Sequence, residues 1–203
     1  ASEKHEKTKI QRCCVDVGAW DGKHLSNTYM LLNSNRLLSD WTGVLIEADV
    51  DRCRSLSKLY SDRPLNTVIN CTVSCLPGST ASLPKVLEKH APNLPKNVDF
   101  ISIDIDGADY WVLVDLFENS NIRPKLVVVE FNPTMPDHLV YIQPRSDTIR
   151  HGSSLRAFTD FMKSRSYVLI ETTIYNVFFV QLEIYDRHFI DIVPNTSIES
   201  LHE

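Results

Sequence analysis

Residues 13–22 read CCVDVGAWDG, and this stretch decides the fold class. Its first five residues, apolar except for Asp16, are typical of a buried strand, and they lead directly into a turn that contains Gly18 and Gly22. A helical pattern follows, and its expected apolar side carries Leu25, Tyr29, Leu32 and Leu37. Strand, glycine turn and helix in this order predict the first unit of a parallel sheet covered by helices.

The same alternation continues along the chain. Further strands are expected at Gly43–Glu47, Thr67–Val73, Val98–Ile103 and Lys125–Phe131, and a terminal hairpin at Tyr167–Ile184, around Tyr175 and Asn176. Helices are expected at Asp49–Tyr60, with Val50, Cys53, Leu56 and Leu59 on its apolar side, at Leu83–His90, around Tyr110–Phe117 and at Ser153–Lys163. The pattern predicts a doubly wound α/β fold with a mainly parallel sheet.

Length and composition indicate one globular domain. The chain has 203 residues, of which 43% are hydrophobic and 23% charged. We expect a polar N-terminal extension at 1–12 and a single domain at 13–203. The segment at about 132–152 holds three prolines and has no clear period, so it is interpreted as a lid-like insertion that is mobile without ligand.

Charge and cysteine content favour some partners and compartments over others. The formal net charge is −5, so no nucleic-acid partner is expected, and no apolar run approaches the ~20 residues of a membrane span. The five cysteines lie mostly in apolar segments, as reduced thiols do, and Cys71 and Cys75 have no partners at zinc-site spacing. We therefore expect a reducing intracellular compartment, cytoplasmic or an organelle matrix. Nothing in the sequence indicates an oligomeric state.

The first two strand ends carry residues typical of a nucleoside site. Gly18 lets a ligand approach the backbone closely, whereas Trp20 stands where a dinucleotide fingerprint would have its second glycine. Glu47 ends the second strand, where an acidic side chain can accept hydrogen bonds from both hydroxyls of a ribose. The alternative is that Glu47 is a solvated strand end or a helix cap. The glycine turn and the acid together indicate adenosine, and Trp20 makes a dinucleotide the less favoured ligand.

The fourth strand leads into three carboxylates, Asp104, Asp106 and Asp109, around Gly107. Such density at the end of a buried strand is costly unless a ligand, a metal or backbone donors compensate the charges. A helix cap would account for one of the three. The pattern therefore indicates a functional site.

Several of these runs resemble, in order and spacing, the FkbM-type methyltransferases. They are VDVGAWDG at 15–22, VLIEAD at 44–49, ISIDIDGADYWVL at 101–113, VVVEFN at 127–132 and NVFFV at 176–180. The family usually has Glu where this chain has Asp106 and Asp109. The resemblance implies the Rossmann-like class I methyltransferase fold, a seven-stranded sheet whose last strand is antiparallel. It also implies S-adenosylmethionine as cofactor and O-methylation of a small-molecule or glycan hydroxyl.

The resemblance also implies roles for individual residues. The expected cofactor contacts are Asp16, Gly18, Ala19, Trp20, Gly22, Glu47, Ala48, Thr72 and Asp104. Thr72 is chosen from its position at the end of the third strand, where Cys71 is the alternative along the adenine edge. The candidate catalytic bases are Asp104, Asp106 and His151. An Mg²⁺ or Mn²⁺ site, similar to that of catechol-type O-methyltransferases, is predicted from Asp104, Asp106, Glu130 and Asn132.

Two other functions compete with this interpretation. The first is a catalytically silent methyltransferase-like domain that acts as a structural or binding subunit, because fold alone does not guarantee activity. The second, an NAD-linked oxidoreductase, is disfavoured by Trp20. Ligand binding separates these possibilities.

Overall fold

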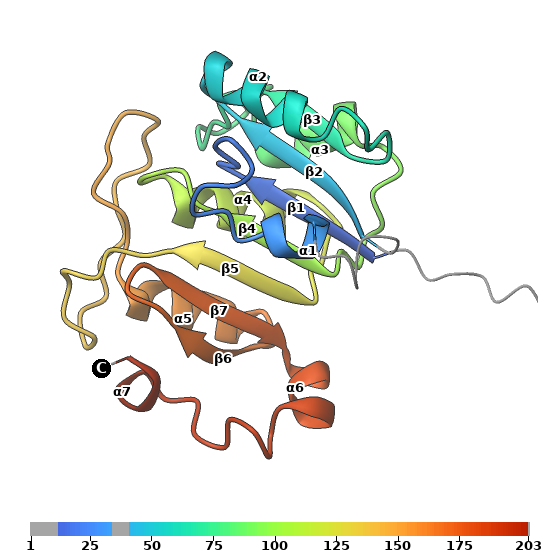
Figure 1. Cartoon of the computed structure of the whole chain (residues 1–203). Helices are drawn as coiled ribbons and strands as arrows, with labels where there is room; N and C mark the ends of the chain where they lie inside the picture. The colour runs from blue at the N-terminus through green and yellow to red at the C-terminus, as the bar shows by residue number, and fades with distance from the viewer. Residues whose placement is uncertain (1–11, 34–40, 203) are drawn as a thin grey trace, which may run out of the picture.

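A computed structural model describes residues 12–33 and 41–202 and shows one seven-stranded sheet with helices on both faces (Figure 1). The strands are β1 Arg12–Val17, β2 Trp41–Glu47, β3 Thr67–Asn70, β4 Phe100–Ile103, β5 Leu126–Glu130, β6 Tyr167–Thr172 and β7 Asn176–Gln181. The helices are α1 Tyr29–Asn33, α2 Val50–Leu59, α3 Leu83–His90, α4 Asp109–Asn119, α5 Leu155–Ser164, α6 Leu182–His188 and α7 Ile198–Leu201.

The strand order is β3-β2-β1-β4-β5-β7-β6. The first five strands pair in parallel, and β7 pairs antiparallel with both β5 and β6. The chain moves outward from β1 to β3 and then returns to place β4 on the other side of β1. This topology confirms the predicted doubly wound, mainly parallel seven-stranded sheet and its antiparallel last strand. The order reverses between β1 and β4, where open α/β sheets bind their ligands.

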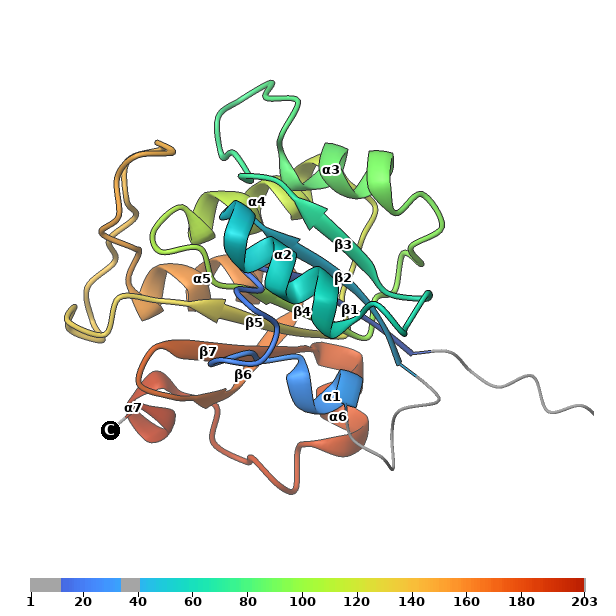
Figure 2. The same cartoon turned by 45° about the horizontal axis from the view of Figure 1, so that its top comes forward.

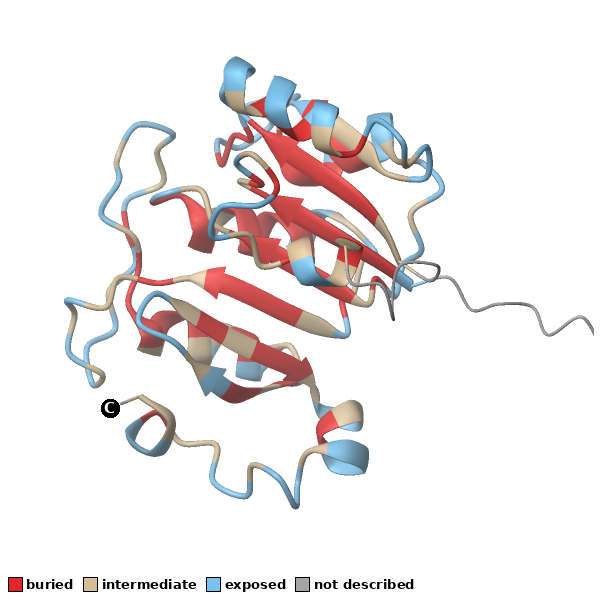
Figure 3. Cartoon of the chain, in the orientation of Figure 1, coloured by how far each residue is buried: buried red, intermediate tan, exposed pale blue. Residues whose placement is uncertain are grey.

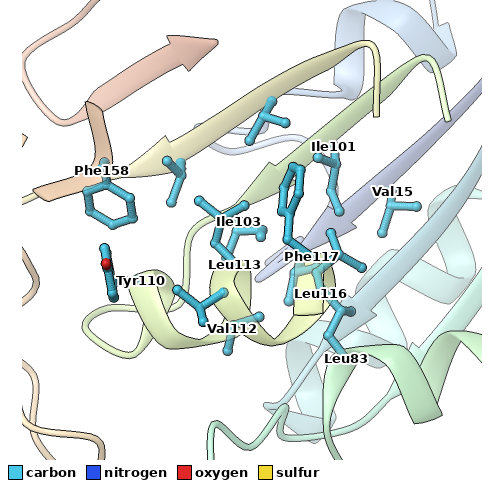
Figure 4. Packing of buried hydrophobic residues seen from close by; sticks show 14 of the residues in the cluster. Val15, Leu83, Ile101, Ile103, Tyr110, Val112, Leu113, Leu116, Phe117 and Phe158 are labelled. Carbon is cyan, nitrogen blue, oxygen red and sulfur yellow. The ribbon is translucent and has the colours of Figure 1, made fainter. Parts of the chain in front are cut away.

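Alternating side chains of the strands form two cores. On one face, Cys14 and Leu45 pack with Leu32 of α1 and Leu56 of α2, and α6 covers the hairpin on the same face (Figure 2). The other face packs against α3, α4, α5 and α7. Figure 4 shows side chains of α4 lying against those of β1 and β4, with Leu113 and Phe117 close to Ile103 and Ile101. The central strands are consequently buried on both sides (Figure 3).

Several expected boundaries are wrong. Leu25, expected on the apolar side of a helix, is 87% exposed and has a φ of 50°. It lies in a segment of turns, in which the side chains of Asp21 and Ser26 accept backbone hydrogen bonds, and α1 begins only at Tyr29. Leu37, the last residue of that expected helix, lies outside the described residues. Val50 is half exposed, since it lies in the first turn of α2, directly after the N-cap.

The third and fourth strands are shorter than expected, because β3 stops at Asn70 and β4 begins at Phe100. Arg12, assigned to the N-terminal extension, opens β1, and residues 1–11 of that extension are outside the described part. Ile184 lies in α6 rather than in the hairpin, and neither α6 nor α7 was expected from the periodicity.

Between β5 and α5, residues 132–152 form a long connection without helix or strand, which we call the strap. All five cysteines are free in the structure. Within the described residues, no helix combines the length and the apolar character that a membrane crossing requires.

Candidate functional site

A pocket of about 580 Å³ opens at the carboxyl ends of β1, β2, β3 and β4, at the reversal of strand order. Four strand ends and the strap form its wall. The lining residues are Val17, Gly18, Trp20, Ile46, Glu47, Ala48, Asp49, Arg52, Cys71, Thr72, Val73, Asp104, Ile105, Asp106, Ala108, Asp147, Ile149 and Arg150. Because these segments are far apart in sequence, only the folded chain brings them together.

The glycine turn joins β1 to both of its neighbours. The backbone N–H groups of Gly18 and Ala19 both donate to the carbonyl oxygen of Ile46, at 2.9 and 3.0 Å. Gly18 has a φ of +88°, and a Cβ built there would lie 1.7 Å from the carbonyl oxygen of Asp104. A side chain is therefore excluded here by the close approach of the β4 end, before any ligand is considered.

Glu47 fixes the turn from the β2 side. The residue is 6% exposed, and its two carboxylate oxygens accept hydrogen bonds from the backbone N–H groups of Trp20 and Asp49, each at 2.8 Å. Asp49, rather than Glu47, is the N-cap of α2. A carboxylate oxygen can accept more than one hydrogen bond, so Glu47 can still accept from a ligand in the pocket that it lines.

Trp20 and Arg52 form a stacked pair on the pocket wall. The guanidinium carbon of Arg52 lies 3.3 Å from the centre of the Trp20 ring, in cation–π contact. Arg52 was not among the expected site residues, because a lone basic residue on an amphipathic helix is ordinarily solvated.

Six of the nine expected cofactor residues line the pocket: Gly18, Trp20, Glu47, Ala48, Thr72 and Asp104. The other three, Asp16, Ala19 and Gly22, do not line it and contact neighbouring parts of the chain. Asp16 is buried and accepts a hydrogen bond of 2.6 Å from the Thr28 hydroxyl, and burial raises its pKa to about 6. Ala19 packs in the core, and a Cβ on Gly22 would meet the Leu56 side chain of α2 at 2.5 Å. These two positions serve the packing of the turn.

Asp109, which the sequence grouped with the functional carboxylates, has backbone donors as its hydrogen-bond partners. It is 1% exposed, and its side chain accepts from the backbone N–H groups of Ile105 and Gly107, at 2.8 and 2.7 Å. Burial raises the pKa of this carboxyl to about 7 despite these hydrogen bonds. Asp109 thus holds the shape of the turn at residues 104–108, which we call the acid–glycine turn.

Asp104, Asp106 and Glu130 form the carboxylate cluster, in which one oxygen from each lies within 4.8 Å of the others. Burial, and then the charge of Asp106, raises the pKa of Asp104. Burial, and then the charges of the neighbouring aspartates, raises the pKa of Glu130 to about 8. The cluster can therefore hold a proton or a cation between its oxygens.

Asn132, the fourth expected metal ligand, is engaged elsewhere. Its amide nitrogen donates to the carbonyl oxygen of His151 at 2.6 Å, and its side-chain oxygen accepts from the backbone N–H and the hydroxyl of Thr134. These three hydrogen bonds hold Asn132 within the strap. The candidate metal ligands are then the three residues of the carboxylate cluster.

A second pocket of about 180 Å³ adjoins the first and shares Asp106 and Arg150 with it. Its other lining residues are Gly107, Asp109, Glu130, Phe131, Asn132, Pro133, His151, Gly152 and Tyr175. The carboxylate cluster stands at the junction, because Asp104 lines the first pocket and Glu130 lines the second. His151, an expected base, belongs to the second pocket.

The strap is anchored at several points. Gln143 is fully buried, and its amide group donates to the Ile149 carbonyl and accepts from the N–H groups of His151 and Gly152. Asp147 accepts from the Ser74 hydroxyl at 2.7 Å and from the Cys75 N–H at 2.8 Å. Neither residue was expected from the sequence, since the strap has no periodic pattern that marks its inward side chains.

Residues 73–169 match the model of a family described as the methyltransferase FkbM domain. No curated protein sequence matches the chain. The solved structures that resemble it include three methyltransferase domains. The CMeT domain of citrinin polyketide synthase is 12% identical and covers 86% of this chain and 47% of that chain, with a TM-score of 0.52. The METTL16 MTase domain (14%, 87%, 62%, 0.51) and the N-terminal domain of human METTL16 in complex with SAH (12%, 85%, 62%, 0.50) are similar to the same extent. The chain spans about half to three fifths of these structures' length, and at such identities the likeness shows the fold alone.

Proposed function

We propose, from the premise that this chain contains an FkbM-type methyltransferase domain, that it transfers the methyl group of S-adenosylmethionine to a hydroxyl of a small-molecule or glycan acceptor. The observation that carries the proposal is the pair of adjoining pockets with the carboxylate cluster at their junction. Methyl transfer needs such a layout, because donor and acceptor must be aligned while a proton is removed.

The first pocket suits the cofactor. Its volume lies within the range of pockets that bind small molecules. Glu47 would accept the ribose hydroxyls, and Ala48 and Thr72 would border the adenine. Gly18 and Asp104 lie on the β4 side and would border the methionine half. When bound, the cofactor supplies an electrophilic methyl group.

The second pocket would receive the acceptor. Phe131 and Tyr175 give it apolar walls, and the carboxylate cluster lies at its inner end. Glu130 joins Asp104, Asp106 and His151 as a candidate base, because its raised pKa makes its ionised form a stronger proton acceptor than an ordinary glutamate. The acceptor hydroxyl would lose its proton to one of these groups during the transfer.

Calorimetry tests the cofactor assignment. We expect S-adenosylhomocysteine to bind and NAD not to bind, and Glu47→Gln to weaken S-adenosylhomocysteine about tenfold or more, because charge-assisted hydrogen bonds to the ribose are lost. Binding of NAD alone would overturn the proposal. Binding of S-adenosylhomocysteine without methyl transfer to any hydroxyl acceptor in a labelled-methyl assay would favour the silent-domain alternative.

A divalent cation at the carboxylate cluster is the second candidate feature, favoured by the three oxygens within 4.8 Å. Oxygen ligands suit Mg²⁺ or Mn²⁺, which would lower the pKa of a bound acceptor hydroxyl, and the proton would then pass to His151 or to water. Titration of Mn²⁺ into wild type and Asp106→Asn, with S-adenosylhomocysteine present, tests this. Equal heats of Mn²⁺ binding for the two proteins, or a rate of methyl transfer that EDTA does not change, would contradict the metal site. The carboxylate cluster would then remain a candidate base.

A further inference from the structure

The charges around the first pocket are unevenly balanced. Among the described residues that line it, five are acidic and two are basic, the latter being Arg52 and Arg150. The methionine half of S-adenosylmethionine is a zwitterion, so its ammonium group suits the carboxylates at the β4 end. Its α-carboxylate needs a donor in the same region, because a buried anion without a partner is costly.

Arg52 lies beside the carboxyl end of β2, in the helix that follows this strand. It lies in the first turn of α2, and its guanidinium stacks on Trp20, whose backbone N–H is bonded to Glu47. Glu47 is the expected ribose ligand. Arg52 therefore lies on the side of the pocket where Glu47 would bind the ribose.

Arg150 is placed beside the β4 end. Its Cα lies 2.7 Å from where a Cβ on Gly107 would stand, so the strap backbone rests directly on the acid–glycine turn. Its guanidinium pairs with Asp106 at 3.3 Å, and both side chains are 68% exposed. An ion pair this exposed is weak, which leaves the guanidinium able to turn toward a ligand anion. Arg150 also lines the second pocket, so it stands where the methionine half approaches the acceptor.

We propose that Arg150 binds the α-carboxylate of S-adenosylmethionine from the strap. This inference rests on the proposed function and assigns a cofactor-binding role to a residue outside the glycine turn and the strand ends. A planar guanidinium matches a carboxylate with two parallel hydrogen bonds. Since Gln143 pins the backbone on either side of Arg150, the bound cofactor would hold the strap against the acid–glycine turn.

A pair of ligands tests the assignment. S-adenosylhomocysteine carries the α-carboxylate, whereas 5′-methylthioadenosine has the same adenosine and sulfur without the amino-acid head. We expect Arg150→Gln to weaken S-adenosylhomocysteine about ten- to hundredfold in calorimetry, as loss of a charge-assisted contact does, and to leave 5′-methylthioadenosine within about twofold. Arg150→Lys should recover part of the lost affinity, because lysine restores the positive charge but cannot form the two parallel hydrogen bonds of a guanidinium.

Arg52→Gln is the matched control, since it removes the other guanidinium of the same pocket. It should weaken both ligands by a similar factor. The inference is overturned if Arg150→Gln weakens both ligands equally, or leaves S-adenosylhomocysteine unchanged, or if the selective loss appears in Arg52→Gln. Failure of both ligands to bind wild type would instead overturn the proposed cofactor, so the two failures are distinguishable.

Discussion

Gly18 has a conformation and surroundings that no other residue type can share. From sequence, Gly18 is expected to let a ligand approach the backbone, and it does line the first pocket. The structure adds a second constraint, because a Cβ would overlap the carbonyl oxygen of Asp104 at 1.7 Å. We expect even Gly18→Ala to lower the free energy of unfolding by about 3 kcal/mol or more, since positive-φ strain and overpacking add together. Urea denaturation measures this.

Gly78→Ala provides the control for that prediction. Gly78 has a φ of +76°, comparable to that of Gly18, but a Cβ at this position would meet no atom within 4 Å. Its substitution should cost only the conformational strain, about 1 kcal/mol. If Gly18→Ala and Gly78→Ala lower the free energy of unfolding equally, the contact with Asp104 does not restrict the residue type at position 18.

Asp109 gives a prediction about pH. Its pKa is raised from 3.8 to about 7 by burial, so between these values the folded state holds a proton that the unfolded state has lost. The contribution of Asp109 to the free energy of unfolding is therefore full below about pH 4 and falls as the pH rises toward 7. Asp109→Asn does not titrate and keeps one acceptor oxygen for the two N–H groups.

At pH 5, Asp109→Asn should be less stable than wild type by about 1–3 kcal/mol, because one buried N–H is left without its acceptor. The deficit should narrow as the pH rises to 8, where the wild-type carboxyl is ionised in the interior. Denaturation at several pH values tests this. A deficit that widens with pH would mean that the folded state stabilises the carboxylate.

Sequence separates the ligand-facing residues from the structural ones only in part. Trp20 and Glu47 were identified from their places after strands, and both line the pocket. Asp16 and Asp109 carry the same carboxylate and lie equally near strand ends, yet each is buried on partners close by in the chain. Whether a carboxylate meets a ligand or a neighbouring donor depends on turn geometry, which residue type and spacing do not specify.

The strap is the element on which the site depends most. Its lack of helix and strand follows from its prolines and absent periodicity. Its attachment depends on the Gln143 amide, which periodicity does not distinguish from an exposed glutamine. Gln143→Ala would leave one carbonyl and two N–H groups without partners. We expect amide exchange at His151 and Gly152 to accelerate about tenfold or more, because each lost hydrogen bond lowers the local opening free energy by about 1 kcal/mol or more.

Gln181→Ala is the matched control for the strap. Gln181 lies in β7, and its amide donates to the carbonyl oxygens of Arg123 and Pro124, away from both pockets. Gln181→Ala should leave amide exchange in the strap unchanged.

A further prediction concerns the wild-type protein with ligand. S-adenosylhomocysteine should slow amide exchange at 147–150, as expected of a lid that orders over its ligand. Unchanged exchange on ligand addition would leave the strap as a fixed wall.

At the scale of the whole molecule, the fold was the most predictable feature. Alternating strand and helix signals restrict the chain to a covered parallel sheet, and the resemblance to a family supplied the strand number and the antiparallel strand. The C-terminal helices were missed because α7 is a single turn and α6 continues directly from β7. Short helices are held by tertiary contacts, and so they leave little periodic signal.

The assembly of the first pocket from separate segments has a consequence for the whole fold. Its lining residues come from stretches around 17–20, 46–52, 71–73, 104–108 and 147–150, which meet only in the native state. A ligand of this pocket therefore stabilises the folded chain against global unfolding. At a hundred times its dissociation constant, S-adenosylhomocysteine should raise the free energy of unfolding by about 2.7 kcal/mol, and Tm by roughly 5–10 °C for a chain of this size. Differential scanning calorimetry at increasing ligand concentration should show a continuous rise. A Tm that levels off at low ligand, or that rises equally with NAD, would contradict a specific adenosyl site formed by the native sheet.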